Sequence, residues 1–119
     1  MNRYLFDPAP QPALHVEGSD LLYPVRRIFC VGRNYVAHAV EMGGEVDREA
    51  PWYFLKSAHA LQHSGTVLPY PPGTENFHHE VELVFALQAS VFKADMGQAA
   101  AAVGYLASGL DMTRRDRQQ

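Results

Sequence analysis

The sequence predicts a mixed α+β domain that is mainly β. Short apolar segments of strand length outnumber the segments with helical character. Prolines and glycines separate these segments at close intervals, as turns between strands require. With 119 residues, of which 47% are hydrophobic, the chain has room for one core. We therefore expect a domain of short strands in which helices are few and brief.

The N-terminal segment is expected to form a small β arm. Residues 3–6 and 13–16 are short apolar runs, and three prolines lie between them. Proline cannot donate a hydrogen bond to a sheet, so it marks a turn or an edge between two strands. We expect these two runs to form a hairpin or arm within residues 1–24 and the main domain to occupy residues 25–119.

The next part of the chain is expected to place a short helix between two buried strands. Residues 26–32 are a strand candidate, and Asn34 can cap a helix that the glycines at 43 and 44 end. The polar residues 45–51 are expected to be an exposed loop. Residues 52–56 (WYFLK) are the second strand candidate.

The C-terminal half carries the strand with the clearest pattern. Residues 67–73 are proline-rich and must be extended, and residues 77–87 (FHHEVELVFAL) follow as a strand. The alanine-rich residues 95–104 predict a helix that closes at a glycine. Residues 105–112 predict another strand, after which Thr113 could cap a last helix.

Composition argues against several classes of partner. The formal charge is −3, and the only cluster of basic residues lies at the end of the chain, so no broad cationic face is available for nucleic acid. The first residues lack a signal-peptide pattern, and no apolar run has membrane-spanning length. We expect a cytoplasmic protein. The single cysteine, Cys30, excludes a disulfide framework and is expected to be a buried, inert thiol rather than a nucleophile.

The strand at residues 77–87 carries two glutamates on one face. Because side chains alternate along a strand, Glu80 and Glu82 share a face with His78. A solvated strand face would explain them without any function. Two neighbouring carboxylates repel each other, however, and a hard divalent ion relieves that repulsion. The opposite face is expected to be core, and it includes Val81, Leu83, Phe85 and a buried His79.

Four stretches together resemble the fumarylacetoacetate hydrolase family, in particular its fumarylpyruvate hydrolase members. They are VGRNYVAHAVEMG (31–43), FLK (54–56), LPYPPGTENFHHEVELVFAL (68–87) and GYLASGLDMTRRDRQ (104–118). A lone E-x-E is weak evidence, whereas E-x-E after YPP and HH and before GLDMTRRD is specific. The resemblance implies the N-terminal portion of a β-sandwich roll with short helices, because family members are considerably longer.

The resemblance also implies a metal site and a catalytic pair. Glu80, Glu82 and Asp111 match the three carboxylate ligands of a Mg²⁺ or Mn²⁺ ion, although Asp111 alone could simply flank a helix. His38 and Glu41 match a dyad in which the carboxylate orients the imidazole and the imidazole takes a proton from the attacking water. An isolated H-x-x-E is more often a surface pair on a helix.

The remaining expectations concern the substrate. Arg33, Arg115 and Gln118 match active-site positions of relatives, and Arg115 with Gln118 could bind a substrate carboxylate. The resemblance implies metal-dependent hydrolysis of the carbon–carbon bond of a small acylpyruvate, fumarylpyruvate giving fumarate and pyruvate in gentisate-type aromatic catabolism, by a homodimer. The alternatives are an oxaloacetate-type decarboxylase of the same family and a non-catalytic half that needs a partner chain.

Overall fold

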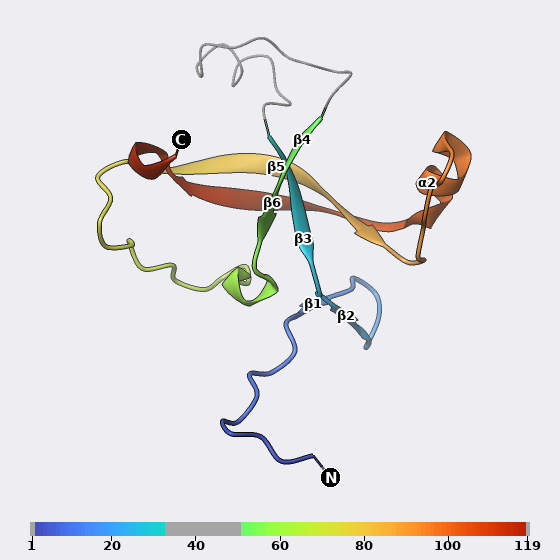
Figure 1. Ribbon diagram of the computed structural model, residues 1–119, viewed down its shortest axis with the longest axis horizontal. Coiled ribbons are helices and arrows are strands. Elements are labelled where there is room, and N and C mark those ends of the chain that lie inside the picture. The colour runs from blue at the N-terminus through green and yellow to red at the C-terminus, as the bar shows by residue number, and fades with distance from the viewer. Residues whose placement is uncertain (1, 33–50, 119) are drawn as a thin grey trace. The chain divides into compact units, whose positions relative to one another are not determined.

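The structure, a computed structural model, describes residues 2–32 and 51–118. It divides into two compact units, Met1–Val67 and Leu68–Gln119. The predicted mainly β class is confirmed, since the described part of the chain contains six strands and one α-helix. In chain order the elements are β1 (Ala13–His15), β2 (Leu22–Pro24), β3 (Ile28–Gly32), β4 (Trp52–Lys56), η1 (Ala58–Ala60), β5 (Phe77–Leu87), α2 (Met96–Ala102), β6 (Val103–Arg114) and η2 (Arg115–Arg117) (Figure 1).

The N-terminal arm is a hairpin, and one of the two expected strands is confirmed, since β1 lies within the predicted run 13–16. β1 pairs antiparallel with β2, and residues 3–6 form no strand, so that part of the prediction is wrong. The turn between β1 and β2 contains Gly18 at a φ of +76°, a conformation that glycine adopts without a steric penalty. β2 ends at Pro24, where a residue without an N–H group is tolerated at the end of an edge strand. The division at residues 24 and 25 stays a prediction.

The second sheet of the N-terminal unit joins β3 to β4. β4 has the predicted bounds, whereas β3 begins at Ile28, two residues later than expected. The two strands pair antiparallel, and the last pair brings Gly32 opposite Trp52. A side chain at Gly32 would collide with the indole ring, so glycine allows the tryptophan to lie across the strand. The helix expected after Asn34 lies outside the described residues.

The C-terminal unit is built on a long antiparallel hairpin of β5 and β6, with α2 in the connection between them (Figure 1). β5 has the predicted bounds. Asp95 caps α2 and forms a capping box with Gln98, which explains why the helix begins at Met96. α2 ends at Ala102 rather than at residue 104, because β6 already begins at Val103.

The far end of β6 differs from the prediction. The strand continues to Arg114, so Thr113 lies within it and caps no helix. A 3₁₀-helix of three residues, η2, follows in place of the expected last helix. Sheet pairing explains this difference, because Thr113 and Arg114 are held opposite His78 and Phe77 of β5.

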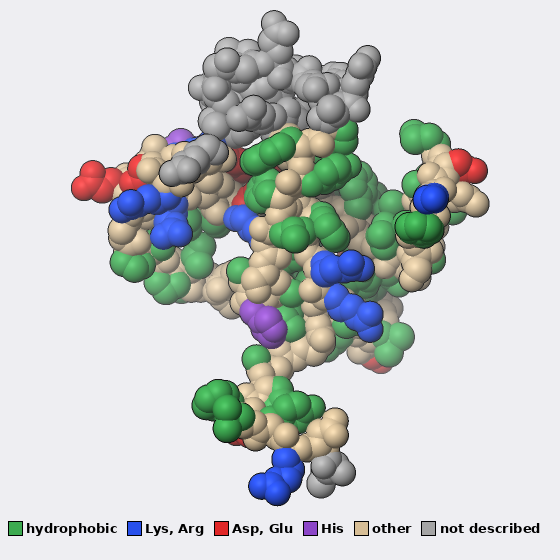
Figure 2. Space-filling model, viewed as in Figure 1, with side chains coloured by type: hydrophobic (Ala, Val, Ile, Leu, Met, Phe, Trp, Pro, Cys, Tyr) green, Lys and Arg blue, Asp and Glu red, His purple; other side chains and the backbone are tan. Residues whose placement is uncertain are grey.

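Burial shows which expected core positions are wrong. Each sheet among the described residues has two strands, and a sheet face is buried only where another layer covers it. The β5 face expected to be core is therefore open, and His79 is exposed rather than buried. β4 is likewise exposed on one face, and Cys30 is only half-buried. Hydrophobic side chains are accordingly widespread on the surface in Figure 2.

The β5–β6 hairpin has one exposed apolar surface, the β5–β6 outer face. Antiparallel register places its members on the side of the hairpin opposite Glu80 and Asp111. They are Val81, Leu83, Phe85, Leu106 and Leu110, each between 59% and 66% exposed. A contiguous apolar patch of this kind is typical of a surface that packs against more protein. None of the described helices has both the length and the apolar character that crossing a membrane requires.

Candidate metal centre

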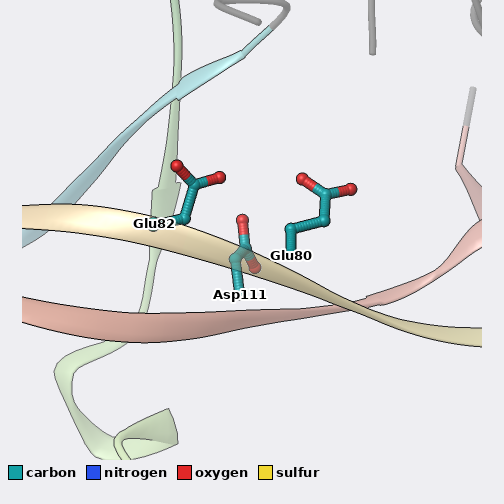
Figure 3. A group of neighbouring side chains, drawn as sticks. All are labelled: Glu80, Glu82 and Asp111. Carbon is teal, nitrogen blue, oxygen red and sulfur yellow. The ribbon is translucent and has the colours of Figure 1, made fainter. Parts of the chain in front are cut away.

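Three carboxylates converge on one face of the β5–β6 hairpin (Figure 3). Glu80 and Asp111 are directly opposite each other in the antiparallel register, and Glu82 follows Glu80 on the same face of β5. The hairpin thus brings together Glu80 and Asp111, which are 31 positions apart in the sequence (111 − 80). The structure places the three predicted ligands side by side.

The arrangement fits a hard divalent cation. One carboxylate oxygen from each of Glu80, Glu82 and Asp111 lies within 4.8 Å of the other two. All three residues are half-buried, and Oε1 of Glu80 and Oδ1 of Asp111 are shielded from solvent. Oxygen donors suit Mg²⁺ and Mn²⁺, and three carboxylates leave positions open for water or a substrate. The donor set contains no thiolate or imidazole among the described residues, so nothing in it favours zinc.

Glycine keeps the space beside these carboxylates open. The cross-strand partner of Glu82 is Gly109, so no side chain stands opposite that glutamate. A Cβ atom at Gly109 would come within 3.0 Å of a methyl group of Val84, a contact tighter than van der Waals packing allows without movement. Small size at position 109 is therefore part of the shape of the site.

Arg115 forms an ion pair with one of the three carboxylates. Its Nη2 lies 2.7 Å from Oε1 of Glu80, and the two side chains are 14% and 23% exposed. Its Nη1 donates to Oε1 of Gln118 at 3.0 Å. Two of the three residues predicted to bind the substrate thus contact each other, and Arg115 also contacts a predicted metal ligand. This second contact was not predicted, because an ion pair between β5 and the segment after β6 depends on the sheet register.

A second contact that was not predicted joins Thr74 to Asp116, the residue after Arg115. Thr74 is buried, and its hydroxyl donates to the carboxylate of Asp116. A threonine after PPG in the sequence predicts only a turn. No local pattern links it to an aspartate 42 residues later. The remaining predicted site residues, Arg33, His38 and Glu41, lie outside the described residues, and their roles stay predictions.

Replacing Arg115 with glutamine should tighten Mn²⁺ binding. A metal ion at Glu80 would compete with the guanidinium for the same carboxylate, and like charges repel across a half-buried site. We expect the dissociation constant for Mn²⁺, measured by calorimetric titration, to fall by roughly tenfold, in line with a change of about 1.4 kcal/mol. Arg114→Gln is the matched control, because Arg114 precedes Arg115 in the chain, ends β6 and is exposed. Equal affinity in the wild type and Arg115→Gln would show that Arg115 does not compete with the ion for Glu80.

The chain is similar to known proteins over most of its length. The chain resembles the crystal structure of fumarylpyruvate hydrolase from Pseudomonas aeruginosa in complex with Mn²⁺ and pyruvate, with a TM-score of 0.85 and 46% identity, over 96% of this chain and 51% of that one. It is 46% identical to fumarylpyruvate hydrolase of a Ralstonia species over 79 residues, which are 65% of this chain and 41% of the relative. It is 37% identical to an oxaloacetate tautomerase of Escherichia coli over 102 residues, which are 86% of this chain and 46% of the relative.

The chain therefore spans about half the length of the relatives it matches. The model of the fumarylacetoacetate (FAA) hydrolase C-terminal domain matches residues 27–119, which include the carboxylate group, Arg115 and Gln118. The match covers well over half of the chain. The chain belongs to the fumarylacetoacetate hydrolase family.

Proposed function

We propose that this chain carries the metal ligands and catalytic residues of an acylpyruvate hydrolase. The reaction we favour is hydrolysis of fumarylpyruvate to fumarate and pyruvate. The observation that carries the proposal is the convergence of Glu80, Glu82 and Asp111 on one face of the hairpin. Support comes from the similarity to fumarylpyruvate hydrolases. The crystal structure of one of them contains Mn²⁺ and pyruvate.

In this proposal the three carboxylates hold Mg²⁺ or Mn²⁺. A bound ion supplies Lewis-acid polarisation of the keto and carboxylate oxygens of an α-keto acid. The carboxylates fix the position of that charge, since they come from two paired strands rather than from a loop. The open space at Gly109 leaves room beside them.

The substrate carboxylate is assigned to Arg115, Gln118 and Arg33. Arg115 contacts Glu80 and Gln118, and a guanidinium has five N–H donors in a planar fork that matches the two oxygens of a carboxylate. Arg115 is held in one orientation by these two contacts, which suits the bidentate recognition of a carboxylate. Binding at this point would orient the pyruvyl half of the substrate.

The water-activating step is assigned to His38 with Glu41 behind it. The imidazole takes a proton from water as the oxygen adds to the carbonyl carbon of the acyl group. The bond between that carbon and the pyruvyl methylene then breaks, and its electron pair stays on the methylene carbon. This carbon takes up a proton, so the products are a carboxylic acid and pyruvate.

A second candidate is oxaloacetate chemistry. The similarity to an oxaloacetate tautomerase favours it. Tautomerisation and decarboxylation are the two reactions considered, and both act on oxaloacetate, an α-keto diacid. Both reactions need an α-keto acid held beside a cation, but neither needs an attacking water. Both would therefore retain Glu80, Glu82 and Asp111. Decarboxylation would make His38 less important as a base, whereas tautomerisation still needs a base to take a proton from carbon.

The proposal predicts a metal-dependent loss of fumarylpyruvate absorbance. Turnover should stop when EDTA removes the ion and return when Mn²⁺ or Mg²⁺ is added. Oxaloacetate, followed in parallel by its own absorbance and by pyruvate release, should react more slowly. Faster consumption of oxaloacetate would favour the second candidate. A rise in melting temperature with Mn²⁺, but no turnover of either substrate, would favour the non-catalytic half.

We also propose a homodimer that acts in gentisate-type aromatic catabolism in the cytoplasm. The β5–β6 outer face supports assembly, because its apolar side chains are exposed and the C-terminal unit has no further sheet among its described residues to cover them. The pathway follows from fumarylpyruvate as substrate. The oligomeric state can be measured by light scattering on the purified protein.

A further inference from the structure

The short helix η2 is held in place by the loop at residues 73–76. A 3₁₀-helix of three residues has little stability of its own, and Arg114 provides no side-chain cap. The loop compensates with backbone contacts: the N–H group of Arg115 donates to the carbonyl of Asn76 at 2.8 Å. At the other end, Nε of Arg117 donates to the carbonyl of Gly73 at 2.9 Å. Gly73 itself has a φ of +74°, which explains glycine at the start of the loop.

Asp116 is the centre of this arrangement. One carboxylate oxygen accepts from the hydroxyl of Thr74, and the other accepts from the backbone N–H group of Glu75 at 2.9 Å. The Thr74 hydroxyl in turn accepts from the N–H group of Asn76 at 3.2 Å. The hydrogen bond from Thr74, and then that from Glu75, holds the pKa of Asp116 below its usual value. Asp116 is therefore ionised at neutral pH and can hold both donors.

The three arginines around Asp116 have different surroundings. Arg114 is exposed, and Arg117 binds the loop carbonyl. Only Arg115 reaches the carboxylate group, through its ion pair with Glu80. An arginine side chain has many rotamers, so a guanidinium holds a fixed place only if its own backbone is fixed. The backbone of Arg115 is fixed by the loop, and Asp116 holds the loop.

We propose that Asp116 is a positioning residue that, by clamping residues 73–76 onto η2, places the Arg115 guanidinium against Glu80. The side-chain hydrogen bonds of Asp116 go to Thr74 and Glu75, so it acts on the carboxylate group through Arg115. Its catalytic consequence rests on the proposed function, in which Arg115 binds the substrate carboxylate. Its structural consequence does not depend on turnover.

The structural consequence can be measured by NMR on the side chain of Arg115. In the wild type its Nε–Hε group should be rigid. In Asp116→Asn one acceptor oxygen replaces two, so Thr74 and Glu75 can no longer donate to separate oxygens and the clamp loosens. We expect the order parameter of that group to fall from about 0.85 to below about 0.6. Glu75→Gln is the matched control, because the clamp uses only the backbone of Glu75.

Thr74 provides a second route to the same result. Thr74→Val keeps the shape of the side chain and removes the hydroxyl, so it should mobilise Arg115 as Asp116→Asn does. Thr74→Ser keeps the hydroxyl and should restore the wild-type signal. If Asp116→Asn does not fold, the comparison of these two variants decides the question.

Kinetics then test the catalytic consequence. Asp116→Asn should raise KM for fumarylpyruvate by about 5- to 10-fold and leave kcat within about threefold, because substrate binding is affected more than chemistry. In the Arg115→Gln background the same change should add less than about twofold. A general structural defect would have the same effect in both backgrounds.

The two measurements separate the two proposals. Mobile Arg115 in Asp116→Asn and Thr74→Val supports the positioning role even if the wild type turns over no acylpyruvate, which would contradict only the proposed function. An unchanged Arg115 signal in both variants overturns the positioning role, whatever the activity. So does a KM effect of Asp116→Asn that persists unchanged when Arg115 is glutamine.

Discussion

Asp111→Asn should lower kcat/KM for fumarylpyruvate by at least about a thousandfold, because losing the metal removes several kcal/mol of transition-state stabilisation. The substitution keeps the size and shape of the side chain and removes one negative charge from the group. Asp111 is the only ligand of the three that β6 contributes, so the site cannot close around an ion without it. Steady-state kinetics at saturating Mn²⁺ measure this loss.

The same variant should change thermal stability in opposite directions with and without metal. In EDTA its melting temperature should equal or exceed that of the wild type, because three carboxylates within 4.8 Å repel each other. At a Mn²⁺ concentration about 100 times its dissociation constant, binding stabilises the wild type by about 2.7 kcal/mol. A chain of this size then melts roughly 10 °C higher, and Asp111→Asn should lose that increase.

Glu75→Gln is the matched control for Asp111→Asn. It also converts an acid into an amide in the C-terminal unit, and Glu75 is exposed and outside the carboxylate group. Its response to Mn²⁺ should be that of the wild type. A normal Mn²⁺ response in Asp111→Asn would contradict the proposed metal site, even if that variant were inactive.

Elements with a strong local pattern could be predicted from the sequence. β4 and β5 have the expected bounds because each is rich in aromatic and apolar residues, contains no glycine or proline, and lies between turn residues. The alanine-rich segment gave α2 for the same reason, since helix propensity there has no competing pattern. β2 was missed because Pro24 argues against a strand, and only its pairing with Ala13 makes this edge position acceptable.

Burial could not be predicted, because it depends on layers rather than on one strand. Alternation correctly separates the two faces of β5. Glu80 lies on one face, and its partner Asp111 on β6 lies on the same side of the hairpin. Alternation does not say which face another layer covers. The apolar face was expected to be core and is open, whereas the carboxylate face is half-buried and has Arg115 beside it.

The candidate site divides in the same way. The three carboxylates could be proposed from a motif, and the register of a single hairpin brings them together. The ion pair between Arg115 and Glu80 joins residues that are 35 positions apart in the sequence (115 − 80). The hydrogen bond between Thr74 and Asp116 joins residues that are 42 positions apart. Such contacts depend on tertiary structure and have no signature in a local window of sequence.

His38→Ala should lower kcat by about 10²- to 10⁴-fold, the usual contribution of a general base, and leave the Mn²⁺ dissociation constant within about twofold. The reason is a division of labour in the proposed mechanism. Glu80, Glu82 and Asp111 hold the ion, while the imidazole moves a proton from water. A loss of turnover at normal metal affinity, measured by kinetics and by calorimetric titration on the same preparation, would separate the two tasks.

Two further variants make the test of His38 specific. Glu41→Gln should reduce kcat less than His38→Ala does, because it removes the charge that orients the imidazole but leaves the base itself. His15→Ala, an exposed histidine on β1, is the control and should have wild-type kinetics. If His38→Ala retained full turnover of fumarylpyruvate, water activation by this residue would be excluded. If it lost that turnover but kept oxaloacetate conversion, the two reactions would share the metal ligands and differ in the base, as expected when only one of them consumes water.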